Sequence, residues 1–85
     1  MKTYQHYNQR VIEGKRSTAL EAAFLFCDFV EIFNNFKPTF SLDDTIQKDT
    51  INVRCYIDME GLPEEADFSV WFPKWAKAFE IEVID

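Results

Sequence analysis

A helical pattern of apolar and polar positions marks the first half of the chain. Thr18 and Glu21 have the spacing of a capping box, in which each side chain accepts a backbone N–H of the first turn. Strong helix formers follow, and Asn35 with Pro38 ends the pattern, because the residue before a proline avoids helical geometry. The spacing therefore predicts a helix over residues 18–35.

The apolar residues of this predicted helix cover more than one face. At about 100° per residue, its polar residues share an arc of roughly 80° and its apolar residues cover nearly all the rest. A helix that packs on one sheet needs an apolar stripe only somewhat wider than about 100°. The apolar residues are Leu25, Phe26, Cys27, Phe29, Val30, Ile32 and Phe33. The surplus apolar surface has to be covered by the rest of the fold or by another chain.

Residues 51–57 alternate as a β-strand does. Apolar residues stand at every second position, which predicts a half-buried antiparallel strand with one wet face. Phe40, Leu42 and Ile46 give a partner strand its matching face. We therefore expect a hairpin with its turn near residues 47–49.

The two ends of the chain also carry strand patterns. Residues 3–13 contain β-formers without a clean period, and we place a short strand at residues 7–13. At the other end, residues 79–83 alternate apolar side chains with Glu80 and Glu82. This alternation predicts a last strand with one acidic face.

Residues 63–79 leave two alternatives open. Aromatic residues recur there at helical spacing, which favours a kinked or broken helix over the whole segment. Pro73 interrupts it, because a proline removes one helical hydrogen bond. In the other interpretation, residues 67–72 form a strand and a short helix starts at Pro73. The aromatic residues of the stripe are Phe68, Trp71, Phe72, Trp75 and Phe79.

These elements predict an α+β fold in the order β-α-β-β-α-β. The commonest packing of this order is the ferredoxin-like plait, an antiparallel sheet with two helices on one face. The alternative, if residues 67–72 are a strand, is one long helix packed on a β-meander. The length indicates a single domain, residues 1–85, in which residues 1–16 form a basic N-terminal segment. Terminal segments of this kind are often partly mobile.

The composition indicates a globular, intracellular protein. Apolar residues make up 47% of the chain, yet no apolar run approaches the roughly 18 residues that span a bilayer. The N-terminus lacks the apolar core of a signal peptide. Cys27 and Cys55 form no Cys-x-x-Cys pair, and we expect both to be reduced and buried. We therefore expect a cytoplasmic protein without a membrane partner.

The charge is distributed unevenly along the chain. The net charge is −6, of which residues 1–16 contribute +3 and residues 17–85 contribute −9. A negative field opposes phosphate binding. RNA recognition on an open sheet face also needs outward aromatic residues and a positive potential. Tyr56 is the one outward aromatic residue that the pattern places, so we expect no direct binding of nucleic acid.

The sequence lacks the residues that most enzymes require. His6 is the single histidine, so paired-histidine metal motifs are absent, and two glycines cannot build a phosphate loop. Asp43, Asp44 and Asp49 do not have EF-hand spacing. We expect no catalytic residue, no metal site and no cofactor. A small-ligand-binding enzyme is an alternative that would need a buried polar group near Asp28 or His6.

The leading functional hypothesis combines the apolar surplus with the acidity. Both features are typical of a protein-binding module, an inhibitor or adaptor that occupies a partner's surface. The predicted acidic face consists of Asp58, Glu60, Glu80 and Glu82. The predicted apolar anchors, provided that they are exposed, are Trp71 and Trp75.

Such an acidic face suits a partner protein with a basic nucleic-acid-binding groove, where it acts as a nucleic-acid mimic. Phage-type inhibitors of host nucleases or defence complexes share this general character, although the chain carries no motif of a known family. The structural alternative is a homodimer, or a subunit of a larger assembly, that is joined through the apolar side of the first helix.

Overall fold

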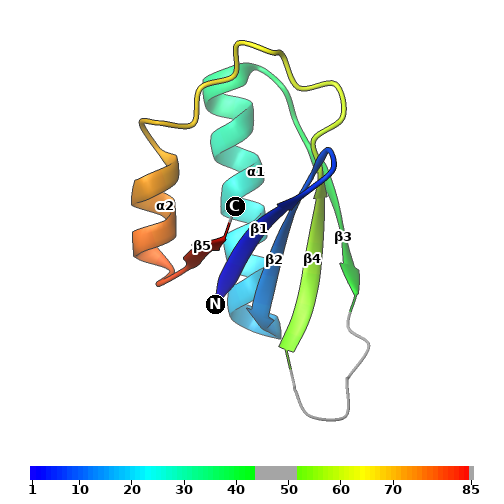
Figure 1. Cartoon of the computed structure of the whole chain (residues 1–85), viewed down its shortest axis with the longest axis vertical. Helices are drawn as coiled ribbons and strands as arrows, with labels where there is room; N and C mark the ends of the chain where they lie inside the picture. Colours follow the sequence, from blue (N-terminus) through cyan, green and yellow to red (C-terminus); the bar gives the residue numbers. More distant parts are fainter. Residues whose placement is uncertain (44–51, 85) are drawn as a thin grey trace.

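The computed structural model describes residues 1–43 and 52–84, which form one mixed five-stranded sheet and two helices (Figure 1). The strands are β1 (Lys2–His6), β2 (Gln9–Lys15), β3 (Thr39–Asp43), β4 (Asn52–Asp58) and β5 (Glu82–Ile84). The helices are α1 (Arg16–Asn34) and α2 (Phe72–Ala78). The described chain therefore has the element order β-β-α-β-β-α-β.

The sheet has the strand order β3-β4-β2-β1-β5. All neighbours are antiparallel except β1 and β5, which are parallel. Both helices share one core with the sheet face that carries Ile12 and Cys55. The predicted α+β class is confirmed. The predicted ferredoxin-like plait is wrong, because two strands precede α1 and the strand order differs, and the sheet is not a meander, because β4 lies beside β2.

β1 is the strand that the sequence pattern did not reveal. Thr3 faces the helices and Tyr4 faces the other side, so the strand carries no polar–apolar alternation. Tyr7 and Asn8 connect β1 to β2, and Tyr7 adopts a φ of 53°, which is uncommon for an aromatic residue. Two-residue hairpin turns are normally signalled by Asn-Gly or Asp-Gly. The hairpin of β1 and β2 therefore replaces the single strand predicted at residues 7–13.

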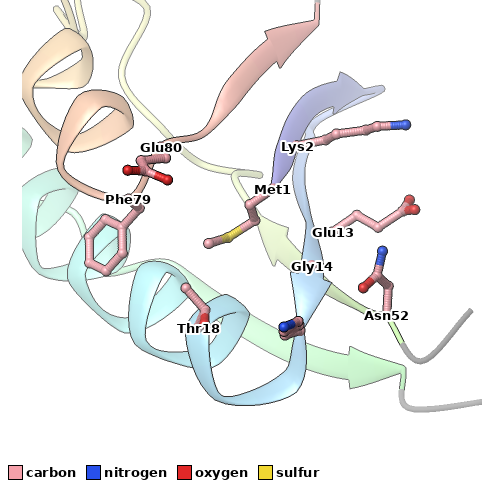
Figure 2. A pocket seen from close by; sticks show the side chains of 9 residues that line it. Met1, Lys2, Glu13, Gly14, Thr18, Asn52, Phe79 and Glu80 are labelled. Atoms are coloured by element: carbon pink, nitrogen blue, oxygen red, sulfur yellow. The ribbon is translucent and has the colours of Figure 1, made fainter.

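The start of the chain lies against β2, beside the first turn of α1 (Figure 2). A Cβ atom on Gly14 would lie 2.5 Å from Cγ of Met1, so residue 14 has to be glycine for Met1 to keep this position. The carbonyl oxygen of Met1 accepts a hydrogen bond from the N–H of Glu82 at 2.7 Å. This bond attaches β5 to the start of β1.

α1 follows β2 directly and begins two residues before the predicted cap. Lys15 occupies the N-cap position in an extended conformation and makes no side-chain capping hydrogen bond. The predicted capping box of Thr18 and Glu21 is wrong, because Thr18 already lies within the first turn. The C-terminal end agrees with the prediction: Asn35 has a left-handed φ of 51°, and its N–H donates to the carbonyl of Glu31.

The hairpin of β3 and β4 confirms the alternating pattern. Val53, Cys55 and Ile57 are buried on the helical side, whereas Arg54 and Tyr56 lie on the opposite face of β4 and are partly exposed. The two strands pair antiparallel over the whole length of β3. The predicted turn at residues 47–49 lies outside the described residues.

α2 is much shorter than the predicted helix over residues 63–79. It starts at Phe72, and Pro73 lies in its first turn, where the missing N–H of a proline would have no helical partner. Residues 67–72 do not form a strand either, but the alternative start at Pro73 is close to the observed one. The N–H of Phe72 donates to the carbonyl of Phe68 at 2.9 Å. This single turn before α2 accounts for the helical spacing of the aromatic stripe.

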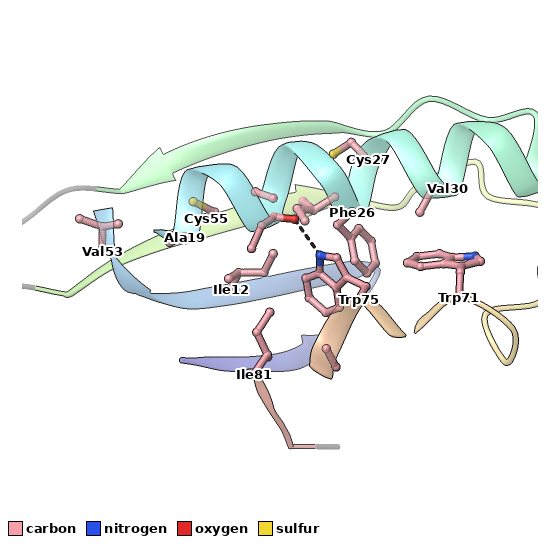
Figure 3. Close-up of a cluster of buried hydrophobic side chains, with 14 residues drawn as sticks. Ile12, Ala19, Phe26, Cys27, Val30, Val53, Cys55, Trp71, Trp75 and Ile81 are labelled. Carbon is pink, nitrogen blue, oxygen red and sulfur yellow. Dashed lines mark hydrogen bonds between the residues drawn. The ribbon is translucent and has the colours of Figure 1, made fainter. Parts of the chain in front are cut away.

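An aromatic cluster fills the space between the two helices and the sheet (Figure 3). The ring of Phe26 makes edge contacts with Trp71 and Trp75, at centroid distances of 5.3 and 5.1 Å. Nε1 of Trp75 donates a hydrogen bond to the carbonyl of Ala22 at 3.0 Å. Nε1 of Trp71 is buried without a partner among the described residues. The two buried tryptophans therefore differ in one hydrogen bond.

This difference predicts unequal costs for two matched substitutions. We expect Trp75→Phe to lower the free energy of unfolding by about 1 kcal/mol more than Trp71→Phe, because only Trp75 loses a hydrogen bond. Both variants lose a similar ring volume from fully buried positions, so each serves as the control for the other. Urea unfolding followed by circular dichroism measures both values. Equal losses in the two variants would show that the hydrogen bond to Ala22 makes no net contribution to the free energy of unfolding.

Candidate functional site

Part of the apolar surplus of α1 reaches the surface. Phe26 and Val30 are buried, but the side chain of Ile32 is 74% exposed and that of Phe33 is 49% exposed. The Phe33 ring also stacks beside Trp71, with centroids 6.3 Å apart, so it connects the core to the surface. The core of the described chain thus takes up some of the apolar residues of α1 and leaves others in contact with solvent.

A groove of about 360 Å³ lies where α1 ends. Asn35 turns the chain out of the helix towards β3, and the connection from β4 to α2 crosses beyond the end of the helix (Figure 1). The groove is lined by Ile32, Phe33, Asn34, Asn35, Pro63, Glu65 and Asp67. Its helical wall is therefore partly apolar, and its opposite wall carries carboxylates.

The surroundings of this groove are negative. Residues 59–71 contain four acidic residues and no lysine or arginine. Hydrogen bonds from Ser69 lower the pKa of Asp67 and keep it ionised. The last turn of α1 carries no basic residue, so the partial negative charge of the helix end is not offset there. Asp28 adds a carboxylate one turn before Ile32 on the exposed side of the helix.

We refer to Ile32, Phe33, Glu65 and Asp67 as the acidic groove. The cation nearest to it in the chain is Lys37, whose Nζ lies 3.9 Å from a carboxylate oxygen of Glu31. Both side chains of that pair are more than half exposed, so the pair is weak. An apolar contact surrounded by carboxylates is the arrangement that a basic protein surface would complement.

The four carboxylates predicted as one acidic face do not form one face. Asp58 ends β4, and its Oδ1 accepts a hydrogen bond from the N–H of Glu60 at 2.9 Å. Glu80 follows α2, and Glu82 pairs in register with Lys2, the first residue of β1. They are separated because β5 pairs parallel to β1 and starts at the end of the sheet opposite to Asp58. Asp58 and Glu60 lie at the end from which residues 59–71 leave the sheet.

Trp71 and Trp75 do not meet the condition for the predicted anchor role. Each is 1% exposed, because both indoles fill the space between α1 and the sheet. The exposed residues that sequence reasoning missed are Ile32 and Phe33. The signal that indicated them was the width of the apolar arc of the first helix, but an arc does not show which of its sides a second helix will cover.

The sheet has a second face that no described helix or strand covers. There Tyr4 and Tyr56 flank Val11 in register, and Val11 is fully buried although none of the described helices or strands packs on it. Burial raises the pKa of Tyr4. Beside this row, Nε of Arg54 donates to a carboxylate oxygen of Glu13 at 3.1 Å. Sequence reasoning placed Tyr56 on this face but missed Tyr4, since it missed β1.

A second hollow, of about 370 Å³, lies beside Met1 and the first turn of α1 (Figure 2). Two lysines and two glutamates line it, so its charges balance, unlike those of the acidic groove. Within residues 1–43 and 52–84, no three His, Cys, Asp or Glu side chains are grouped so that they could hold a metal ion. Neither of the described helices combines the length and the hydropathy needed to cross a bilayer.

No family model, curated protein or solved structure matches the chain. The surfaces of the molecule are therefore the guide to its function. The two that stand out are the acidic groove at the end of α1 and the uncovered face of the sheet.

Cys27 and Cys55 are free and buried, as predicted. Burial, together with the neighbouring carboxylate of Asp28, raises the pKa of Cys27 to about 11. Burial also raises the pKa of Cys55. A thiol is nucleophilic in its ionised form. Neither cysteine is therefore poised for nucleophilic chemistry at neutral pH.

We expect the protein to lose stability in alkaline solution through Cys27. Between its ordinary pKa of 9.0 and its folded pKa of about 11, the folded protein keeps a proton that the unfolded chain has released. The free energy of unfolding therefore falls as the pH rises across this window. Urea unfolding at several pH values measures the slope, and Cys27→Ala should make it shallower. Identical slopes for the two proteins would contradict this assignment.

Proposed function

We propose that this protein is a small, acidic, non-enzymatic protein-binding module that acts as an inhibitor or adaptor by occupying a basic surface of a partner protein. The observation that carries the proposal is the acidic groove. In it, Ile32 and Phe33 are exposed at the end of α1, next to the carboxylates of Glu65 and Asp67.

The apolar residues would supply most of the binding energy. Burying a fully exposed large apolar side chain contributes about 1.5–3 kcal/mol, and Ile32, which is 74% exposed, can gain most of this. Phe33 is already held by its stacking on Trp71, so little side-chain freedom is lost when a partner covers it. A rigid apolar anchor surrounded by polar residues is the usual composition of a binding hot spot.

The carboxylates would set the orientation and the choice of partner. Complementary charge speeds encounter and excludes partners of the wrong sign. Asp58 at the end of β4, and Glu60 in the connection from β4 to α2, add two further carboxylates at the end where this connection leaves the sheet. A basic groove that normally takes nucleic acid fits this surface, and a protein that covers such a groove acts as a nucleic-acid mimic. A nuclease or a phage-defence complex in the cytoplasm is a target of this kind.

The anionic character of the groove makes it a poor site for a second copy of the chain. Two acidic grooves that face each other would bring like charges together, which costs several kcal/mol at an interface. The hypothesis of a homodimer joined through the apolar side of α1 is therefore less well supported than binding to a basic partner.

Affinity capture followed by mass spectrometry, at low and at high salt, tests the proposal. The immobilised protein should retain a basic partner that is lost at high salt, because screening weakens charge attraction. Ile32→Ser should reduce the captured amount at least tenfold. Val83→Ser is the matched control, since Val83 is also exposed but lies on β5, away from the groove.

A second pair of variants separates the two acidic regions. Replacing Glu65 and Asp67 with lysine should slow association with the captured partner in a salt-dependent way. Replacing Glu80 and Glu82 with lysine changes the net charge equally but leaves the groove intact, so association should slow much less. If the Glu80 and Glu82 variant is the slower of the two, the contact lies at the other end of the molecule and the groove is not the site.

A further inference from the structure

The uncovered face of the sheet is organised in rows that run across the strands. One row contains Tyr56, Val11, Tyr4 and Ile84, which are neighbours in register from β4 through β2 and β1 to β5. Ile84 is 42% exposed, and both tyrosines are partly exposed. Among the residues that the structure describes, no helix or strand lies over this row (Figure 1). An apolar and aromatic row thus crosses the middle of an open sheet.

The adjacent row alternates in charge across all five strands. In the order of the strands, its members are Asp43, Arg54, Glu13, Lys2 and Glu82. Neighbouring opposite charges stabilise the sheet of a single molecule, and the bond of 3.1 Å between Arg54 and Glu13 is one such pair.

A row of alternating charge is complementary to itself. When two copies pack face to face about a two-fold axis parallel to the strands, the strand order of one copy is reversed in the other. An axis between β2 and β1 then places Glu13 opposite Lys2 of the second copy, and Arg54 opposite Glu82 of the second copy. An axis between β4 and β2 also brings opposite charges together. The row therefore attracts a copy of itself in either position.

The same symmetry operation matches the apolar row. With the axis between β2 and β1, Tyr56 lies over Ile84 of the second copy, and Tyr4 lies over Val11 of the second copy, which its own neighbours already cover. Aligned sheets pack about 10 Å apart, a distance that side chains of this size fill from both sides. Tyr4, Tyr56 and Ile84 are thus the members of this row that a second copy can cover, next to charged side chains that face opposite charges.

We propose that the open face of the sheet binds a second copy of this chain, which gives a symmetric, face-to-face homodimer. In either position of the axis four strands of each copy overlap, and four strands at about 4.8 Å spacing with five residues at about 3.3 Å make a face of roughly 19 by 17 Å. This face is smaller than that of standard specific interfaces, which use about 800 Å² of accessible surface on each partner. We therefore expect weak, reversible association that develops in the upper part of the micromolar range. The dimer does not depend on the acidic groove, which lies on the helical side.

Sedimentation velocity from low micromolar to several hundred micromolar protein tests this dimer. The average mass of the unmodified chain should rise from that of a monomer to that of a dimer. Tyr56→Glu should weaken the association at least tenfold, because it places a charge within the apolar row. Tyr56→Phe should retain the association and serves as the control. Circular dichroism establishes that both variants are folded.

A charge-segregation experiment tests the pairing itself. One double variant, Lys2→Glu with Arg54→Glu, has an entirely negative row. The other, Glu13→Lys with Glu82→Lys, has a positive row apart from Asp43. Each double variant should stay monomeric alone, and an equimolar mixture should form the mixed dimer in native mass spectrometry.

Several outcomes would overturn the dimer. One is an unmodified chain that stays monomeric at every concentration. Another is a folded Tyr56→Glu variant that associates as well as the unmodified chain. A dimer that is lost in Ile32→Ser and kept in Tyr56→Glu would place self-association on α1 instead. Should a charge-segregated variant fail to fold, the two Tyr56 variants still decide the question. The loss of partner capture by Ile32→Ser is a separate result that concerns the acidic groove alone.

Discussion

The contact between Trp75 and the alanine-rich side of α1 is the interaction on which the rest of the structure depends. The small side chains of Ala22 and Ala23 leave room for the whole indole, whose N–H then reaches the carbonyl of Ala22. This contact fixes α2 beside α1. The position of α2 in turn brings β5 to the edge of β1 and carries residues 59–71 past the end of α1 (Figure 1). Both surfaces of interest follow from that placement.

The two surfaces differ in the symmetry of their charges, and this difference decides what each is suited to bind. The acidic groove has one sign of charge and repels its own copy, so it suits a basic partner. The open face of the sheet alternates in sign and attracts its own copy. Because the surfaces lie on opposite sides of the sheet, a face-to-face dimer leaves both grooves free. Two linked grooves would bind a symmetric partner more tightly than one, since the second contact forms within the same complex.

Local periodicity predicted the elements whose two faces differ clearly in polarity. The hairpin of β3 and β4 and the C-terminal end of α1 belong to this group, because Val53, Cys55 and Ile57 alternate with polar residues and Asn35 and Pro38 stop the helix. The same reasoning failed at β1, whose faces are both partly polar, and at the aromatic stripe before Pro73. There, one turn and a short helix have the same spacing as a long helix. Local periodicity also indicated an apolar surplus on the first helix, but it did not show which of these apolar residues stay exposed.

Properties that depend on near neighbours in the chain could be inferred from the residues alone: an α+β composition, buried cysteines, an acidic body and an overly apolar helix. Contacts between distant segments decided everything else. The pairing of β5 with β1 separated Glu82 from Asp58, and the packing of Trp71 against Phe29 and Phe33 buried an indole that would have been an anchor only if exposed. The physical reason is that apolar burial is non-directional, so the core and a partner can each cover the same side chain. The space that remains after the helices dock determines which side chains are enclosed and which are left to meet another chain.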